Sequence, residues 1–300
     1  MCGKHVHSSF RAGGFGRFTN RGKNDILLPV KRRGMMEDIL TIEEIRRYLS
    51  GSFPDLECFQ SIDSTNSYLK HRAMDGAPHG STAVADSQSA GRGRLGRSFQ
   101  SPAGKGVYLS ILLRPRQTGE ALMRATGMAA VAVCRAVQRV SGAQVGIKWT
   151  NDLILNGKKL AGILAETVVL GDQVALILGV GVNVHHRRED FQGEVADLAA
   201  SLAMEGYSAS RAALAAAMME ELYAISDASQ QQIQTYVQEY RRSCITLGRE
   251  IRLVWTEDQK KARAIDIDDA FGLVVQLEDG TVSIVRSGEV SVRGLYGYAE

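Results

Sequence analysis

Two long apolar runs joined by a turn place the strongest constraint on the fold. Residues 160–170 and 174–184 are rich in valine, isoleucine and leucine, and the dipeptide Gly171-Asp172 lies between them. Because such a dipeptide favours the tight turn between antiparallel strands, the two runs are predicted to form a β-hairpin. A sheet that contains this hairpin is at least partly antiparallel.

The rest of the chain mixes helical and strand periods, which predicts an α/β fold. From residue 120 to 140 the apolar residues recur with the period of a helix, and Gly142 ends it. From residue 251 onward, short strands separated by turns predict a small barrel. We therefore expect a mixed sheet flanked by helices, with a small β-barrel behind it. Further predicted elements are a helix that begins at Thr41 and is ended by Gly51, a helix that begins near residues 63–65, helices over 210–225 and 230–242, and strands over 82–85, 107–113 and 145–149.

Basic residues gather at the start of the chain. Residues 1–36 carry eight Lys or Arg against the single acid Asp25, a net +7, so the formal charge of +3 leaves −4 for residues 37–300. The first segment is interpreted as a basic, disordered extension, followed by a large domain over 37–242 and the barrel over 243–300. The mildly acidic remainder gives no general sign of nucleic-acid binding. A nucleic-acid binder that acts through the basic extension remains an alternative.

Cysteine usage and hydropathy predict a cytoplasmic protein with no membrane association. No run approaches the roughly 20 apolar residues that cross a bilayer, and the start of the chain lacks a secretory signal. The cysteines are far apart, so no pair has the spacing of a zinc site or a redox motif, and they are interpreted as unpaired thiols in a reducing compartment. They are Cys2, Cys58, Cys134 and Cys244.

The strongest local signal is a long polar loop between two predicted strands, residues 86–106. It contains the run GRGRLGR at residues 91–97. Glycine lets backbone N–H groups approach a phosphate closely, and arginine forks match phosphate or carboxylate oxygens, so the loop is predicted to bind anions. A solvated basic loop is the alternative. The same letters fit the dinucleotide fingerprint, but a strand follows where a helix is required, which argues against a nicotinamide-dependent oxidoreductase.

Two further clusters carry groups that suit a nucleotide. Residues 148–153 (KWTNDL) end a predicted strand in an amide and a carboxylate, which could hold a ribose, an adenine edge or Mg²⁺, or could only shape a turn. Residues 158–164 (KKLAGIL) place two lysines at the start of an apolar strand. Such lysines are more often solvated than catalytic.

The order of these motifs resembles the biotin protein ligases, in the form without an N-terminal DNA-binding domain. Each motif is short, but six in the family's order over more than two hundred residues are specific. They are residues 64–66 (STN), Gln88 with residues 91–97, residues 148–153, residues 159–164, residues 179–183 (GVGVN) and residues 287–293 (SGEVSVR).

The resemblance implies a fold, an activity and a set of site residues. It implies a class II synthetase-like catalytic domain with an SH3-like barrel, which forms biotinyl-AMP from biotin and ATP and passes biotin to a lysine of a biotin carboxyl carrier protein. Lys159 and Arg92 would be catalytic. Biotin would contact Ser64, Thr65, Asn66, Gln88, Gly91, Arg92, Gly93, Arg94, Lys159 and Gly162. ATP and the adenylate would contact Arg94, Arg97, Phe99, Asn151, Asp152, Asn183 and Arg293.

Other implied properties follow from the same resemblance. Mg²⁺ would come with ATP and lie near Asp152, and a homodimer is left open. Thr150 stands where the family commonly has proline, which affects the rigidity of the turn. Phe99 stands where the family often has tryptophan, which affects the packing against adenine. Residues 1–62 hold one predicted helix, too few for the winged helix of family repressors. The nearest alternative activity is ligation of lipoate, which also proceeds through an adenylate intermediate.

Overall fold

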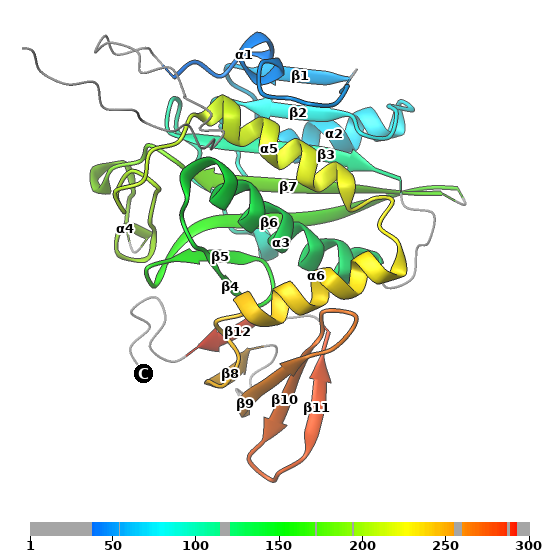
Figure 1. Ribbon diagram of the computed structural model, residues 1–300, viewed down its shortest axis with the longest axis vertical. Helices are drawn as coiled ribbons and strands as arrows, with labels where there is room; N and C mark the ends of the chain where they lie inside the picture. Colours follow the sequence, from blue (N-terminus) through cyan, green and yellow to red (C-terminus); the bar gives the residue numbers. More distant parts are fainter. Residues whose placement is uncertain are drawn as a thin grey trace, which may run out of the picture. The chain divides into compact units, whose positions relative to one another are not determined.

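The residues that the structure describes form two β-sheets, one large and mixed and one small and antiparallel (Figure 1). The structure is a computed structural model that describes residues 38–53, 55–114, 121–171, 173–193, 195–254, 260–286 and 289–292. The large sheet has the strand order β1-β2-β3-β7-β6-β5-β4, and the small sheet has the order β11-β10-β9-β8-β12. The predicted fold class, a mixed sheet flanked by helices with a small β-structure behind it, is confirmed.

The strands of the large sheet are β1 (Leu56–Phe59), β2 (Thr82–Ala85), β3 (Gly106–Leu113), β4 (Gly146–Lys148), β5 (Asp152–Leu155), β6 (Lys158–Leu170) and β7 (Gln173–Asn183). Those of the small sheet are β8 (Glu250–Val254), β9 (Lys260–Ile267), β10 (Leu273–Leu277), β11 (Val282–Val285) and β12 (Glu289–Val292). The helices are α1 (Ile42–Arg46), α2 (Thr65–Met74), α3 (Ala121–Ser141), α4 (Val195–Leu198), α5 (Arg211–Ala224) and α6 (Gln230–Ser243). In these described residues no helix is long and apolar enough to span a membrane.

The predicted hairpin lies at the centre of the large sheet. β6 and β7 pair in antiparallel register from Ala161 opposite Val182 to Leu170 opposite Gln173. The turn begins at Gly171, whose φ of 60° suits glycine, whereas Asp172 lies outside the described residues. β1 and β2 pair in parallel, and the other neighbours in this sheet pair antiparallel.

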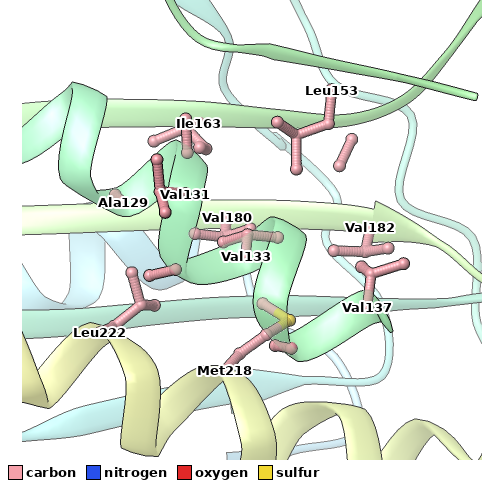
Figure 2. Close-up of a cluster of buried hydrophobic side chains, with 14 of the residues drawn as sticks. Ala129, Val131, Val133, Val137, Leu153, Ile163, Val180, Val182, Met218 and Leu222 are labelled. Atoms are coloured by element: carbon pink, nitrogen blue, oxygen red, sulfur yellow. The ribbon is translucent and has the colours of Figure 1, made fainter. Parts of the chain in front are cut away.

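Alternation along the strands separates the two faces of the large sheet. In β7, Val180 and Val182 belong to the main apolar core, which α3 and α5 cover, and Figure 2 shows them beside Val133 and Val137 of α3. Successive residues of a strand point to opposite faces. Gly179 and the intervening Gly181 therefore face the other side, where α2 packs against β3, β6 and β7.

The strand β5 was missed by the sequence prediction. Residues 148–153 were interpreted as a strand end that drops into polar residues, but Lys148 ends β4 and Asp152 begins β5, which pairs with both β4 and β6. Asn156 and Gly157 connect β5 to β6 with φ values of 48° and 79°, the conformation of a two-residue hairpin turn. Asp152 is thus fixed by ladder hydrogen bonds and does not lie on a loop.

A buried arginine ties together the segments at the base of the long loop. The Arg211 side chain is 4% exposed and donates to the Asp86 carboxylate and to the Gly106 carbonyl at 3.4 Å, at the two ends of the loop. It also pairs with Asp38 at 3.3 Å, and the Asp86 carboxylate accepts the Gly104 N–H at 3.2 and 3.1 Å. The ends of the loop are therefore held close together.

The small sheet contacts the turn between β4 and β5. The Trp149 indole N–H donates to the Phe271 carbonyl at 2.9 Å, and both residues are buried. The Phe271 ring packs edge-on against Tyr240 of α6, whose hydroxyl donates to the Thr150 carbonyl at 3.1 Å. The peptide bond between Trp149 and Thr150 is cis.

We expect Tyr240→Phe to lower the free energy of unfolding by about 1–3 kcal/mol, because it leaves the Thr150 carbonyl without this buried donor while conserving volume. Urea unfolding followed by circular dichroism measures the change. Tyr223→Phe, on a more exposed part of α5, is the matched control and should stay within about 0.5 kcal/mol. Equal effects of the two substitutions would contradict the role of the Tyr240 hydroxyl.

Candidate active site

A cavity opens on the α2 side of the large sheet, between the long loop and the strands β6 and β7. Its walls come from the N-terminus of α2, the loop, the β4–β5 turn and the centres of β6 and β7. The lining residues are Ser64, Thr65, Asn66, Gln88, Arg92, Gly93, Arg94, Arg97, Ser98, Phe99, Asn151, Asp152, Lys159, Gly162, Ile163, Leu164, Gly179, Val180 and Gly181.

Glycines in β7 form the floor because larger side chains would collide with their neighbours. A Cβ atom on Gly181 would lie 2.5 Å from the Phe99 ring, and one on Gly179 would lie 2.0 Å from Asn66 Oδ1. The Phe99 ring also approaches Gly162 of β6. The aromatic side chain of the loop therefore rests directly on the backbone of the sheet.

Hydrogen bonds order the polar end of the cavity. Ser64 caps α2, and the Gln88 Oε1 atom accepts the Thr65 N–H at 2.9 Å. The Thr65 and Ser110 hydroxyl oxygens lie 2.7 Å apart, and Ser110 donates to Asn66 Oδ1 at 2.6 Å. Because that proton of Ser110 is used, Thr65 shares its own hydroxyl proton between Ser110 and Gln88 Oε1, which lies 3.2 Å away, and keeps its lone pairs for a ligand.

The opposite end of the cavity carries the candidate catalytic lysine. Lys159 Nζ lies 2.7 Å from an Asp152 carboxylate oxygen. The register shift between β5 and β6 explains its direction: Leu153 pairs with Ala161 and Ile154 with Lys159, so β6 has one extra residue here. A bulge reverses the alternation, which turns Lys159 toward the cavity.

A tether crosses the mouth of the cavity from the loop to the β4–β5 turn. Arg94 donates to Asn151 Oδ1 at 2.9 Å. The Asn151 amide is itself fixed, because its Nδ2 donates to the Ile163 carbonyl at 2.9 Å. The loop is thus held in a closed position over the sheet.

Arg92 is held at the rim by an acid that the sequence prediction did not include. One terminal nitrogen of Arg92 lies 3.1 Å from Glu166 Oε1, and the same carboxylate accepts from Asn66 and from Lys70. Burial alone would raise the pKa of Glu166, but these hydrogen bonds and the Arg92 charge hold it below its ordinary value. Glu166 is therefore ionised at neutral pH.

Comparison with known proteins places the chain in a family. Residues 58–183 match the model of the biotin/lipoate A/B protein ligase family, and residues 246–293 match that of the biotin protein ligase C-terminal domain. The biotin–acetyl-CoA-carboxylase ligase of Mycobacterium tuberculosis is 34% identical over 242 residues, which cover 78% of this chain and 88% of that protein. The chain belongs to the biotin protein ligase family.

Two further comparisons describe the extent of the likeness. A biotin protein ligase from Aquifex aeolicus, solved in complex with biotin and ATP, superimposes with a TM-score of 0.67 at 28% identity, covering 80% of this chain and 99% of that one. The bifunctional ligase/repressor BirA of Bacillus subtilis is 42% identical over 142 residues, 47% of this chain. This chain covers 44% of that relative's length.

Most of the residues that the family resemblance implied lie together around the cavity. Gly91 lies beside it, where a Cβ atom would meet the Phe99 carbonyl oxygen at 2.3 Å. Asn183 does not line the cavity: its side chain donates to the Ala200 carbonyl at 3.0 Å. Arg293 lies outside the described residues. The remaining thirteen line the cavity, namely Ser64, Thr65, Asn66, Gln88, Arg92, Gly93, Arg94, Arg97, Phe99, Asn151, Asp152, Lys159 and Gly162.

Sequence reasoning missed two kinds of residue at the cavity of this member of the biotin protein ligase family. The first are the floor glycines Gly179 and Gly181, although their motif was recognised. The second are Ser110 and Glu166, polar residues inside apolar strands that contact the lining from behind. A polar residue at an otherwise apolar strand position was the available signal, since a buried polar group requires a partner.

Proposed function

We propose that this protein activates biotin with ATP to form biotinyl-AMP and pyrophosphate, and then transfers the biotin to a lysine of a carrier protein. The observation that carries the proposal is one cavity lined both by the hydrogen-bonding groups of Thr65 and Gln88 and by the cations Lys159 and Arg92. Biotin carries a matching pair of groups, a polar ureido ring and a carboxylate.

The activation step brings two anions together. An oxygen of the biotin carboxylate attacks the α-phosphorus of ATP. The bond from that phosphorus to the oxygen that joins it to the β-phosphorus breaks, and pyrophosphate leaves. At about 4 Å and an effective dielectric near 20, each opposite-charge pair contributes roughly 4 kcal/mol. Lys159 and Arg92 would offset the repulsion between the carboxylate and the phosphate, so no nucleophilic side chain is required.

The transfer step consumes the mixed anhydride. The neutral ε-amine of a carrier lysine attacks the biotinyl carbonyl carbon, the bond to the AMP oxygen breaks, and the amine loses a proton. The loop, tethered through Arg94 to Asn151, would keep water from the adenylate until the carrier docks. The family resemblance suggests adenine packing for Phe99, and its ring edge lies over Gly181 on the floor.

A magnesium ion fits this site as a companion of ATP. Asp152 supplies one carboxylate at the cavity, and Mg²⁺ typically takes one or two protein carboxylates together with phosphate oxygens. Bound there, the ion would neutralise phosphate charge. Among the described residues no group of three or more His, Cys, Asp or Glu gathers around a common point, so most ligands would come from ATP and water.

The carrier and the cellular setting belong to the same proposal. The name of the Mycobacterium relative supports a carboxylase carrier, and we propose the biotin carboxyl carrier protein or domain as the acceptor, in the cytoplasm. We assign catalysis to residues 37–242 and a supporting role to the C-terminal domain, residues 243–300. We leave nucleic-acid binding, a repressor role and a homodimer outside the proposal.

The decisive experiment is biotin-dependent exchange of labelled pyrophosphate into ATP. Exchange that requires biotin would support the activation step, and transfer is then measured with labelled biotin and a purified carrier protein. Lipoate serves as the competing substrate, because the matching family model includes lipoate ligases. A dithiolane ring has no N–H group for the Thr65 lone pairs, so we expect lipoate to support little exchange. Preferential use of lipoate would overturn the proposal.

A chain that begins at Met35 should keep full ligation activity, because the site residues lie beyond it and Asp38, which binds Arg211, is retained. Carrier biotinylation and thermal melting measure the outcome. As a contrast, Asp38→Ala should lower the melting temperature, because it leaves the buried Arg211 guanidinium with one carboxylate instead of two. Loss of soluble, active protein on truncation at Met35 would show that the first residues contribute to the catalytic domain.

A further inference from the structure

Glu166 lies immediately behind the cavity, where it connects three elements. It follows Gly162 and Leu164 along β6 on the same face of the strand, and its side chain is 16% exposed. Its carboxylate accepts from Asn66 Nδ2 at 3.0 Å and from Lys70 Nζ at 3.1 Å, both on α2. Its third partner is Arg92 of the loop, at 3.1 Å.

Arg92 and Lys70 share one oxygen atom of Glu166, Oε1. Two cations that lie this close to a single oxygen repel each other, and only the carboxylate between them makes the arrangement favourable. If Glu166 lost its negative charge, Arg92 would lose its charged contact with the wall of the cavity. The guanidinium would then turn toward solvent, which half of its side chain already reaches.

The same carboxylate also sets the direction of a hydrogen-bond chain through the site. An ionised carboxylate only accepts, so Asn66 must point its Nδ2 toward Glu166 and its Oδ1 toward Ser110. Ser110 then donates to Asn66 and accepts from Thr65. The chain begins and ends on the long loop, because Thr65 contacts Gln88 and Glu166 contacts Arg92.

We propose that Glu166 is a positioning residue for the activation step, which acts by holding Arg92 against the cavity. Glu166 does not line the cavity itself, so its effect must pass through residues that do. The inference rests on the proposed function, in which Arg92 binds the carboxylate of biotin and the α-phosphate. It predicts that removing the charge of Glu166 matters only while Arg92 is present.

The test compares four variants in biotin-dependent pyrophosphate exchange: Glu166→Gln, Arg92→Met, the double variant, and Lys70→Met as the matched control. Glu166→Gln keeps the size and an acceptor for Asn66, and should lower kcat/KM for biotin about tenfold with little change in melting temperature. Lys70→Met removes the other cation from the same oxygen and should stay within about twofold of wild type. Glu166→Gln should change the Arg92→Met enzyme by less than about twofold.

The outcomes separate the positioning role from the proposed function. If Arg92→Met is slow but Glu166→Gln exchanges normally, the positioning role fails and the proposed site survives. If Glu166→Gln and Arg92→Met reduce exchange independently, so that their effects multiply, Glu166 acts by another route and the inference is wrong. If Lys70→Met matches Glu166→Gln, the charge balance of the cluster decides the rate and Arg92 placement does not. Absence of biotin-dependent exchange in wild type overturns the proposed function itself.

Discussion

Replacing Lys159 with alanine should slow biotin-dependent pyrophosphate exchange by roughly 10²-fold or more, the cost of removing one preorganised charge from a reacting centre. Lys159 is the lysine that the β6 bulge turns into the cavity, where it lies 2.7 Å from Asp152. Its ammonium can approach both the biotin carboxylate and the α-phosphate. The loss should appear mainly in kcat, because the ammonium group offsets the repulsion between the two anions most strongly while the carboxylate attacks the phosphate.

Lys158→Ala is the control for this prediction. The two lysines are neighbours in sequence, but adjacent residues of a strand point to opposite faces, so Lys158 points away from the cavity. Lys158→Ala should exchange pyrophosphate at close to the wild-type rate. If Lys159→Ala exchanges normally and Lys158→Ala does not, the catalytic lysine has been assigned wrongly, and the bulge does not have the role that we give it.

The hairpin and the long helix could be predicted from sequence because their signals are local. The two apolar runs on either side of Gly171-Asp172 predict β6 and β7, and the helical period from residue 120 to 140 matches α3 within one residue at each end. β5 was missed although Asn156-Gly157 is a strong turn signal, because the strand is four residues long and begins at the polar Asp152. The helix that begins at Thr41 ends at Arg46, well before Gly51, where the sequence prediction ended it.

The site was predictable to the extent that its residues stand in motifs. The loop and the residues around Lys159 carry charged or amide groups in short runs, and these runs converge on the cavity. Ser110 and Glu166 could not be placed in the same way, because their roles depend on the strand register that brings β3 and β6 beside α2. Strand alternation alone does not distinguish Gly181 from Asn183, because both point to the same face of β7. Asn183 does not line the cavity, and its side chain donates to the Ala200 carbonyl instead.

Arg94→Gly should impair the retention of biotinyl-AMP more than its formation. Arg94 is the tether that joins the loop to Asn151, and Asn151 is anchored to the β6 backbone. Glycine removes the tether and adds backbone freedom, so the closed loop becomes less populated and biotinyl-AMP should dissociate about tenfold faster. The activation chemistry should suffer less, because Lys159 and Arg92 still flank the reacting atoms.

Released biotinyl-AMP is a free acylating agent, so the Arg94→Gly enzyme should label lysines of unrelated proteins. Each enzyme is incubated with biotin, Mg-ATP and albumin, the albumin is probed for biotin, and rapid quench measures adenylate release. Leu95→Gly is the matched control, because it adds a glycine at the neighbouring exposed position, where φ is already 54°, and leaves the Arg94 side chain in place. It should label albumin no more than wild type. Strong labelling by both variants would mean that loop stiffness retains the adenylate; negligible labelling by both, with adenylate formation intact, would mean that other loop residues retain it.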